Sequence, residues 1–258
     1  MTAREGDDLG HPVSIDGPAA RVVSLVPSLT EAIAATRREA LVGATEWCTH
    51  PADLDVTRIR GTKNPDRAAI AALEPDLVLA NREENRELDI RRLREAGIQV
   101  WVTVIETVDE SFASMRRMFT DGLCWDVPAW LLEAERVWAE PVASAGRRVA
   151  VPIWRDPWMV VGARTFTGDV LDRLGLINAF GDGEDRYPHV DLADIDRDDI
   201  DLILLPDEPY VFTADDGPEA FGRAPTTLVS GRSLTWYGPS MVSARADLQR
   251  ALQQTGTT

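Results

Sequence analysis

The sequence predicts an α/β fold with two lobes, each built on a parallel sheet, and three observations lead to this prediction. A helical run passes through an aspartate into a wholly apolar stretch twice, at residues 70–80 and 195–205. Such a stretch has no polar face, so each is predicted to be a strand covered by helices on both sides. Residues 108–146 show only helical patterning, and 258 residues suffice for two cores. We therefore predict two Rossmann-like lobes joined by a single long backbone helix, with a ligand cleft between the lobes.

Strand, turn and helix signals alternate through the first lobe. Residues 21–26 are rich in β-branched side chains, Pro27 ends that strand, and Ser28 and Thr30 suit the start of a helix that continues through residue 35. The remaining elements expected in this lobe are strand 40–44, helix 66–74, strand 77–80, helix 82–96 and strand 98–105.

The connector is expected to contain helices at 108–119 and 129–138, because apolar residues recur at helical spacing there. Since a packed helix resists wide hinge motion, we expect little movement on binding. The second lobe is expected to contain strands 148–153 and 158–161, helix 167–174, strands 202–205 and 227–229, and helix 239–253. The predicted division is a flexible arm at 1–18, a first lobe at 19–122, a backbone helix at 123–147 and a second lobe at 148–258.

Composition excludes several classes of function. The net charge of −16 would repel nucleic acid, and no apolar stretch approaches the roughly 20 residues that span a bilayer, so neither nucleic-acid binding nor membrane insertion is expected. The first residues lack an apolar signal region, and the two cysteines are too few for a disulfide framework, so a cytoplasmic location is expected. Phosphate-binding glycine loops, a G-x-S-x-G elbow and strong metal motifs are absent from the sequence.

Open parallel sheets bind ligands beyond the carboxyl ends of their strands, so the loops at those ends supply the candidate ligand-binding residues. The candidates combine aromatic, acidic and amide side chains. They are Trp47, Cys48, His50, Lys63, Asn64, Asn81, Glu83, Glu84, Asn85, Trp154, Arg155, Tyr187, Glu208, Tyr210, Trp236 and Tyr237.

The chemistry of these loops leaves alternatives open. Flat rings with a polar edge suit a large planar or sugar-like ligand, although each of the eight tryptophans can equally be structural. Cys48 and His50 suit a soft metal or covalent catalysis if they share a face of an extended strand, and a buried thiol beside a hydrogen-bonded histidine is the simpler interpretation. Glu83 and Glu84 can accept hydrogen bonds from a ligand or be neutralised by Arg82 and Arg86. Arg155 can hold an anionic group or form a salt bridge.

Several motifs resemble one family in their order along the chain. They are residues 21–33, Val42-Gly43, 61–64, 73–80 and 162–180. Together they resemble the helical-backbone (class III) substrate-binding proteins of ABC importers for cobalamin, ferric siderophores and haem. The resemblance covers roughly residues 20–252 and implies a cleft that holds its ligand without catalysis.

Within this family, the chain more specifically resembles a branch whose members have no leader sequence. The segments that carry this resemblance are 47–51, 61–64, 80–85, 153–157, 207–210 and 236–238. It implies that Trp47 and Tyr187 occupy aromatic pocket positions, whereas Asn81 and Arg60 stand where the cobalamin binders have tryptophan. It also implies permease docking through one acidic residue on each lobe.

Asp66 fits the first docking position, but Ala193 stands at the second, with Asp194 beside it. We therefore do not expect ordinary docking to an ABC permease.

Two functional hypotheses follow. The first is a non-catalytic binding protein for a metal-containing small molecule, such as a corrinoid, a siderophore or a related chelate, with no cofactor other than that ligand and no tightly built metal site. The second is a cytoplasmic enzyme that uses Cys48 and His50 together with Glu83 and Glu84 on the same scaffold.

Overall fold

The computed structural model describes residues 6–140, 142–144 and 146–254. Its internal contacts divide the chain into two compact units. Unit 1 comprises Met1–Ile105, Asp109–Leu132 and Tyr237–Pro239, and unit 2 comprises Glu106–Val108, Glu133–Trp236 and Ser240–Thr258. Each unit thus includes a short segment that is distant from the rest of it in sequence: Tyr237–Pro239 belong to unit 1, and Glu106–Val108 belong to unit 2.

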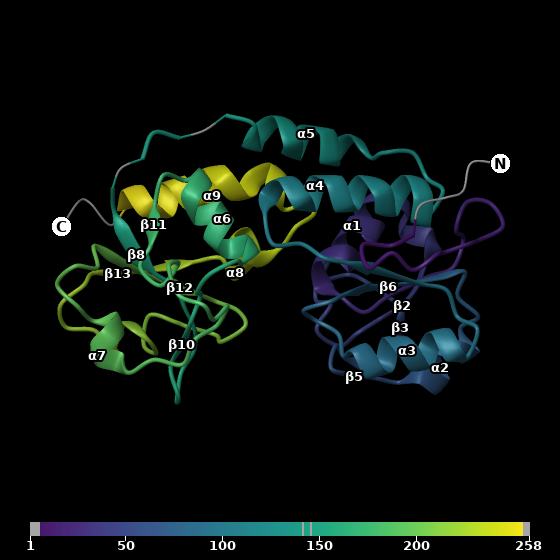
Figure 1. Cartoon of the computed structure of the whole chain (residues 1–258), viewed down its shortest axis with the longest axis horizontal. Helices are drawn as coiled ribbons and strands as arrows, with labels where there is room; N and C mark the ends of the chain where they lie inside the picture. The colour runs from purple at the N-terminus through teal and green to yellow at the C-terminus, as the bar shows by residue number, and fades with distance from the viewer. Residues whose placement is uncertain (1–5, 141, 145, 255–258) are drawn as a thin grey trace. The chain divides into compact units, whose positions relative to one another are not determined.

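Unit 1 is a parallel sheet with helices on both faces. Its strands lie in the order β3 (Thr57–Arg58), β2 (Leu41–Ala44), β1 (Val22–Ser24), β6 (Leu77–Asn81) and β7 (Val100–Thr103), and every pair is parallel. Figure 1 shows α1 (Pro27–Arg37) and α4 (Val108–Arg117) on one face and α2 (Arg67–Ala72) and α3 (Glu87–Glu95) on the other. All five residues of β6 are buried, as its unbroken apolar sequence predicts.

Smaller elements complete unit 1. A short helical turn, η1 (Arg38–Ala40), leads into β2, and an antiparallel pair, β4 (Arg60–Gly61) and β5 (Asn64–Pro65), precedes α2. The helix α4 passes into a π-helical turn, η2 (Met118–Gly122), where Gly122 lies against the ring of buried Trp101. A Cβ at Gly122 would come within 2.7 Å of that ring, so only glycine allows this approach.

Unit 2 repeats the same plan. Its sheet has the order β11 (Ile177–Asn178), β8 (Arg148–Ala150), β12 (Leu202–Pro206) and β13 (Thr226–Val229), again all parallel. The helices are α6 (Phe166–Arg173), α7 (Leu192–Ile195), α8 (Gly231–Thr235) and α9 (Met241–Gln254). An antiparallel pair, β9 (Pro152–Trp154) and β10 (Met159–Val160), and a short turn, η3 (Pro218–Ala220), accompany them. The predicted α/β class with parallel sheets is confirmed.

The repeated aspartate before each apolar strand has the same physical role in both units. The Asp76 carboxylate accepts hydrogen bonds from the backbone N–H groups of Ala20 (2.7 Å) and Arg21 (2.8 Å), at the start of the neighbouring strand β1. The Asp201 carboxylate accepts one from Arg148 N–H (2.7 Å), at the start of β8. Each aspartate also donates its own N–H to the carbonyl of Arg21 or Arg148. These contacts fix the register of the two central strands at their amino ends.

Two predicted helices are shorter than expected. The helix predicted at 82–96 begins only at Glu87, because residues 82–86 form a turn held by asparagine side chains. Within the predicted backbone helix at 123–147, the helix α5 covers Ala129–Trp138. It begins in unit 1 and ends in unit 2.

The predicted flexible arm at 1–18 is anchored to unit 1 over its described part. The Asp7 side chain is buried and accepts hydrogen bonds from Arg94 (2.5 Å) and from Val102 N–H (3.1 Å). Asp8 bonds Val104 N–H (2.8 Å) and forms an ion pair with Arg117. The polar sequence of the arm reflects this pairing rather than freedom in solvent. Residues 1–5 lie outside the described residues.

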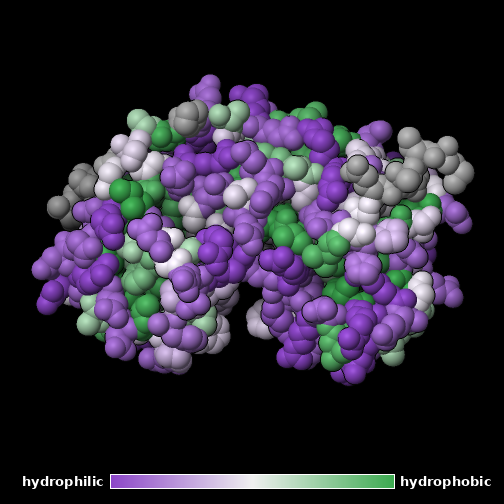
Figure 2. Space-filling view, viewed as in Figure 1, coloured by the Kyte–Doolittle hydropathy of each residue, from purple (hydrophilic) through white to green (hydrophobic). Residues whose placement is uncertain are grey.

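The surface is polar on the face shown in Figure 2, where hydrophilic side chains predominate on each unit. Among the described residues, no helix combines the length and the apolar character that crossing a bilayer requires.

We predict that Asp76→Ala lowers the free energy of unfolding by about 2 kcal/mol, because two backbone N–H groups lose a charged acceptor. Asp201→Ala should cost about 1 kcal/mol, because a single N–H is affected. Urea unfolding followed by circular dichroism measures both, with Asp55→Ala, at an exposed position, as the control. Equal stability of the wild type and Asp76→Ala would contradict this role of the aspartate.

Candidate functional site

Most candidate residues of unit 1 lie at the carboxyl ends of β2 and β6 or in the loops that follow them, whereas Lys63 and Asn64 lie in the β4–β5 hairpin. Trp47, after β2, is 66 % exposed, which is unusual for so large an apolar side chain. Its indole lies against Gly61 of β4, where a Cβ would stand 3.2 Å from the indole nitrogen and 2.6 Å from the Asn64 amide oxygen. The ring therefore lies close to the Gly61 backbone, with much of its area open to solvent.

Asn81 and Asn85 form the frame of the loop after β6. The Asn85 amide oxygen accepts from Asn81 N–H (2.9 Å), and its NH₂ group donates to the Thr62 carbonyl (3.0 Å). The Asn81 amide oxygen accepts from the N–H groups of Glu83 (2.8 Å) and Glu84 (3.3 Å). Both asparagines are buried. Their first role is to satisfy backbone groups and to fix where the two glutamates stand.

Glu84 is the most unusual ionisable group of this loop. Burial raises its pKa, the nearby charge of Glu83 raises it further, and the charge of Lys63 opposes both. Lys63 itself donates from Nζ to the Glu83 carbonyl (2.5 Å). These neighbours hold a carboxyl group in an environment that disfavours its charged form.

Tyr237 reaches the same loop from the far end of the sequence. Burial raises its pKa, the negative charge of Glu84 raises it further, and hydrogen bonding to Ser28 and Thr103 acts in the opposite direction. The phenol therefore stays protonated at neutral pH. Beside it, Gly238 packs against the Ser28 carbonyl, which a Cβ at that position would meet at 3.2 Å.

Cys48 and His50 do not form the pair that the sequence suggested. Residues 46 and 47 form a turn, and residues 48–50 have no regular secondary structure, so Cys48 and His50 do not lie on a strand. The Cys48 thiol is fully buried 3.0 Å from the Thr30 hydroxyl and 3.1 Å from that of Thr45, and burial raises its pKa. The ring of His50 lies beside the Thr49 hydroxyl (3.2 Å). A protonated, enclosed thiol is a poor nucleophile and a poor metal ligand, so the simpler interpretation of this motif fits best.

No group of three or more His, Cys, Asp or Glu side chains suited to a metal ion occurs in the part of the chain that the structure describes. Direct binding of a metal ion by Cys48 and His50 therefore finds no further ligands in the described residues.

In unit 2 an aromatic cluster follows β9 and β12. Trp154 is 46 % exposed, and its ring meets that of Tyr210 edge to face, with centroids 5.8 Å apart. Tyr210 packs in turn on Phe212, and Phe212 stacks on buried Trp158 at 6.1 Å. Trp154 is thus the solvent-facing end of a cluster that is rooted in the core.

Arg155 forms ion pairs rather than offering its charge to solvent. Its guanidinium pairs with Asp216 and with Glu219 (2.5 Å) and lies over the ring of Trp158. The hydrogen bond that Arg155 donates to Glu219 is the main cause that raises the pKa of the Arg155 guanidinium. The Tyr210 hydroxyl also donates to Asp216 (2.7 Å). Of the two roles left open for Arg155, the structure shows the salt bridge.

The remaining candidates of unit 2 lie at different depths. Glu208 is partly buried and packs against Gly231, where a Cβ would stand 2.4 Å from the Glu208 Cγ and 2.6 Å from its carbonyl oxygen. Asp207 accepts from Gly231 N–H (2.7 Å) and so secures the same loop. Tyr187 is partly buried in the loop after β11, and Trp236 is buried with the Arg232 guanidinium over its ring.

Sequence reasoning missed three residues that shape these loops. Ser28 and Thr103 act on Tyr237, and Asp216 pairs with both Arg155 and Tyr210. Thr103 lies within the strand expected at 98–105 and is the last residue of β7, and a polar residue in that apolar run is a signal that could have marked it. Asp216 lies in a polar loop 61 positions after Arg155, and no local sequence pattern predicts the ion pair between these two residues.

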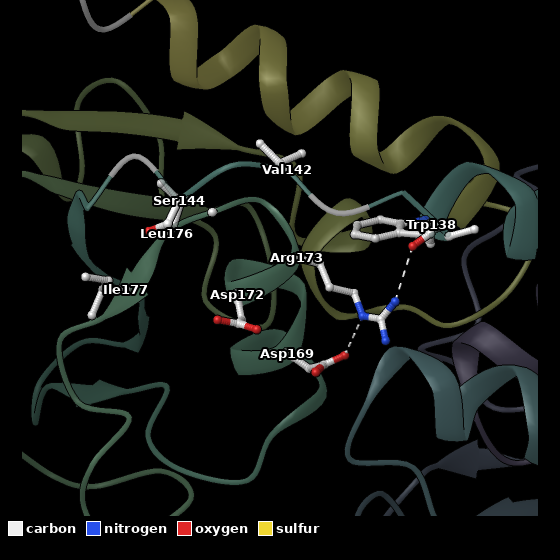
Figure 3. A pocket seen from close by; sticks show the side chains of 10 residues that line it. Trp138, Val142, Ser144, Asp169, Asp172, Arg173, Leu176 and Ile177 are labelled. Carbon is white, nitrogen blue, oxygen red and sulfur yellow. Dashed lines mark hydrogen bonds and ion pairs between the residues drawn. The ribbon is translucent and has the colours of Figure 1, made fainter.

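A separate pocket of about 380 Å³ in unit 2 contains none of the candidates. Figure 3 shows Arg173 between Asp169 (3.0 Å) and the carbonyl of Trp138 (3.2 Å), with Asp172 nearby. Its lining mixes charged and apolar side chains.

Comparisons with known proteins agree with this architecture. The chain is 25 % identical over 204 residues to a vitamin B12-binding protein of Pectobacterium carotovorum, covering 73 % of this chain and 72 % of the relative. It is 24 % identical over 210 residues to a vitamin B12-binding protein of Vibrio cholerae, covering 77 % and 71 %. No protein-family model matches the chain.

Solved structures share the fold over most of their length. The periplasmic vitamin B12-binding protein BtuF of Vibrio cholerae superposes with a TM-score of 0.68 at 18 % identity, covering 94 % of this chain and 100 % of that one. The haem-binding protein HmuT gives a TM-score of 0.73 at 18 % identity, covering 95 % and 88 %. The chain is thus similar in sequence to vitamin B12-binding proteins and shares the fold of these solved binding proteins. These relatives and solved structures are named as binding proteins, which is the class of protein that the first functional hypothesis expected. The predicted cleft and the role of each candidate residue stay predictions.

We predict that Cys48 resists thiol reagents. In a Cys124→Ser variant, dithionitrobenzoate should release almost no thiolate until denaturant is added, because the remaining thiol is buried and its pKa is raised. Wild-type protein, in which Cys124 is partly exposed, serves as the control. Fast reaction of the variant with dithionitrobenzoate under native conditions would contradict this prediction and support Cys48 as a nucleophile.

We also predict that Glu84→Gln stabilises the protein at neutral pH. Because burial raises the folded-state pKa of Glu84, the wild type loses stability as pH rises above the ordinary glutamate value of about 4.3, whereas the glutamine variant does not. The difference in unfolding free energy should vanish near pH 4 and grow towards pH 7. Urea unfolding across this range measures it, and a variant that is less stable at pH 7 would show that the charged form is favoured.

Proposed function

We propose that this protein is a non-catalytic binding protein for a metal-containing small molecule, a corrinoid, siderophore or related chelate. The observation that carries the proposal is the pair of exposed tryptophans. Trp47 lies in the loop after the parallel strand β2 of unit 1, and Trp154 ends the strand β9, which follows the parallel strand β8 of unit 2. Rings of this kind, held from behind by packing, suit a large ligand with flat apolar faces. The relatives named for vitamin B12 and haem support the same ligand class.

We also propose that the protein works in the cytoplasm and does not dock onto an ABC permease in the usual way. Asp66, at the first docking position, is engaged locally: it caps α2 through Ala69 N–H (3.1 Å) and pairs with Arg60 (3.5 Å). Exposed Ala193, in α7, offers no carboxylate at the second position. Fractionation of cells that produce the natural full-length protein tests the location, and recovery in the periplasmic fraction would refute it.

The ligand proposal is tested by titrating the purified protein with cyanocobalamin, haemin and ferrichrome while recording tryptophan fluorescence and visible absorbance. We expect micromolar or tighter binding of at least one of them. Trp47→Ala and Trp154→Ala should each weaken that binding on the order of tenfold, about 1.4 kcal/mol, through lost contact with the ligand.

Leu132→Ala is the matched control, because Leu132 is 51 % exposed but lies on α5, away from the strand-end loops. Circular dichroism verifies that each variant folds. Binding of none of the three chelates would refute the proposal, and unchanged affinity in both tryptophan variants would move the site elsewhere.

A further inference from the structure

The pocket of about 380 Å³ lies wholly within unit 2 and is separate from the strand-end loops. Its lining comes from the end of α5, from residues 142 and 144, from the last part of α6 and from residues 175–177, which lead into β11 (Figure 3). The candidate loops follow strands, whereas this pocket precedes one. Its volume lies in the range of small-molecule sites, about 300–1,000 Å³.

Close packing fixes two walls of the pocket. Gly175 has a φ of +75°, and a Cβ there would stand 2.6 Å from the Ala143 carbonyl oxygen, so the chain at 142–144 lies directly against the end of α6. Trp138 is buried, and its indole N–H donates to the Met241 carbonyl (2.9 Å). Because these walls are held by the fold itself, a ligand would pay little to order them.

The charged side chains of the lining leave one carboxylate open. Arg173 donates from Nε to Asp169 (3.0 Å) and from its guanidinium to the Trp138 carbonyl (3.2 Å). Asp169 also accepts from Val108 N–H (2.8 Å). The Asp172 carboxylate, in contrast, has neither a hydrogen-bond donor nor an ion-pair partner among the described residues, and it is exposed to solvent. Asp172 is therefore the charged group of the lining that can receive a ligand.

The lining as a whole carries a net charge of −1, because it holds two aspartates and one arginine. A further arginine, Arg245, lies over the ring of Trp138, with its guanidinium carbon 6.0 Å from the ring centroid. It does not line the pocket, and it donates to the carbonyls of Val137 and Glu140 (2.5 Å each). A cation entering the pocket thus meets a negative lining whose arginine is already paired.

Apolar side chains form much of the remaining lining. Val142 is partly buried, Leu176 is buried, and Ile177 is 41 % exposed, which is high for a large apolar residue. A ligand body that covered these side chains would remove apolar surface from water. The pocket therefore combines an apolar surface with a single open carboxylate.

We propose that this pocket is a second binding site, which takes a small organic cation with its ammonium group at the Asp172 carboxylate and its apolar body against Val142, Leu176 and Ile177. An ammonium and a carboxylate form a charge-assisted hydrogen bond, and a carboxylate ligand would be repelled. The site is independent of the chelate site proposed above, because the two share no residue.

The test compares three probes that share a phenyl ring and differ in charge: 2-phenylethylamine, 2-phenylethanol and phenylacetate. The full chain, labelled at its isoleucine δ1-methyl groups, is titrated at pH 7.5 and followed by NMR, with the Ile177 resonance assigned through Ile177→Val. The amine should shift the Ile177 methyl signal and saturate. The alcohol should bind about fivefold more weakly, and phenylacetate more weakly still. Added salt should reduce the difference between amine and alcohol, because it screens the ion pair.

Two variants separate the charge from the apolar surface. Asp172→Asn keeps the shape of the side chain and removes its charge, so it should lower the affinity for the amine about fivefold and leave that for the alcohol unchanged. Val142→Thr should weaken both probes to a similar extent, because it makes the shared apolar surface polar. The matched control is Asp194→Asn, which removes the same charge from an exposed position of α7 outside the lining and should change neither affinity.

The outcomes decide the inference without touching the chelate site. Failure of all three probes to bind, equal affinities for amine and alcohol, or tighter binding of phenylacetate would overturn it. Binding of the amine without a shift of the Ile177 methyl signal would also overturn it, since the amine would then bind elsewhere. An equal loss of affinity in Asp172→Asn and Asp194→Asn would show that only the overall charge of the protein matters.

Discussion

The structure depends on one constraint, which is that a buried parallel strand has to satisfy the backbone groups at both of its ends. At the amino end of each central strand, an aspartate accepts hydrogen bonds from the start of the neighbouring strand. The apolar run that follows can then be buried on both faces without losing register. The two halves of the chain look alike in sequence because they meet this constraint in the same way.

The carboxyl ends of the same strands are satisfied differently in the two units. After β6, the side chains of Asn81 and Asn85 bond the backbone of the loop and tie it to the β4–β5 hairpin. After β12, Asp207 bonds the N–H of Gly231, and the glycine lets the loop pack closely against α8. Both solutions make rigid loops, so the side chains that they carry are held in place before a ligand arrives.

The chemistry of these loops favours recognition over reaction. The thiol that could have served as a nucleophile is enclosed by two threonine hydroxyls, and the arginine that could have held an anion is paired with two carboxylates. Ring faces that stay open to solvent include those of Trp47 in unit 1 and Trp154 in unit 2. Flat apolar contact combined with a few polar anchors is characteristic of small-molecule sites, and homology to substrate-binding proteins agrees with this.

The sequence by itself determined the α/β class, the two parallel sheets and the position of their strand-end loops, because unbroken apolar runs and the residues that flank them are local signals. The tertiary structure decided which loop residues are structural and which are open. In the folded protein the side chains of Asn81, Asn85 and Cys48 are buried, and Arg155 forms ion pairs with acidic side chains. Tyr237 lies near Glu84, although more than half of the chain separates them in sequence. These outcomes depend on contacts between segments that are distant in sequence, and a short-range pattern of hydrophobicity or spacing carries no record of such contacts.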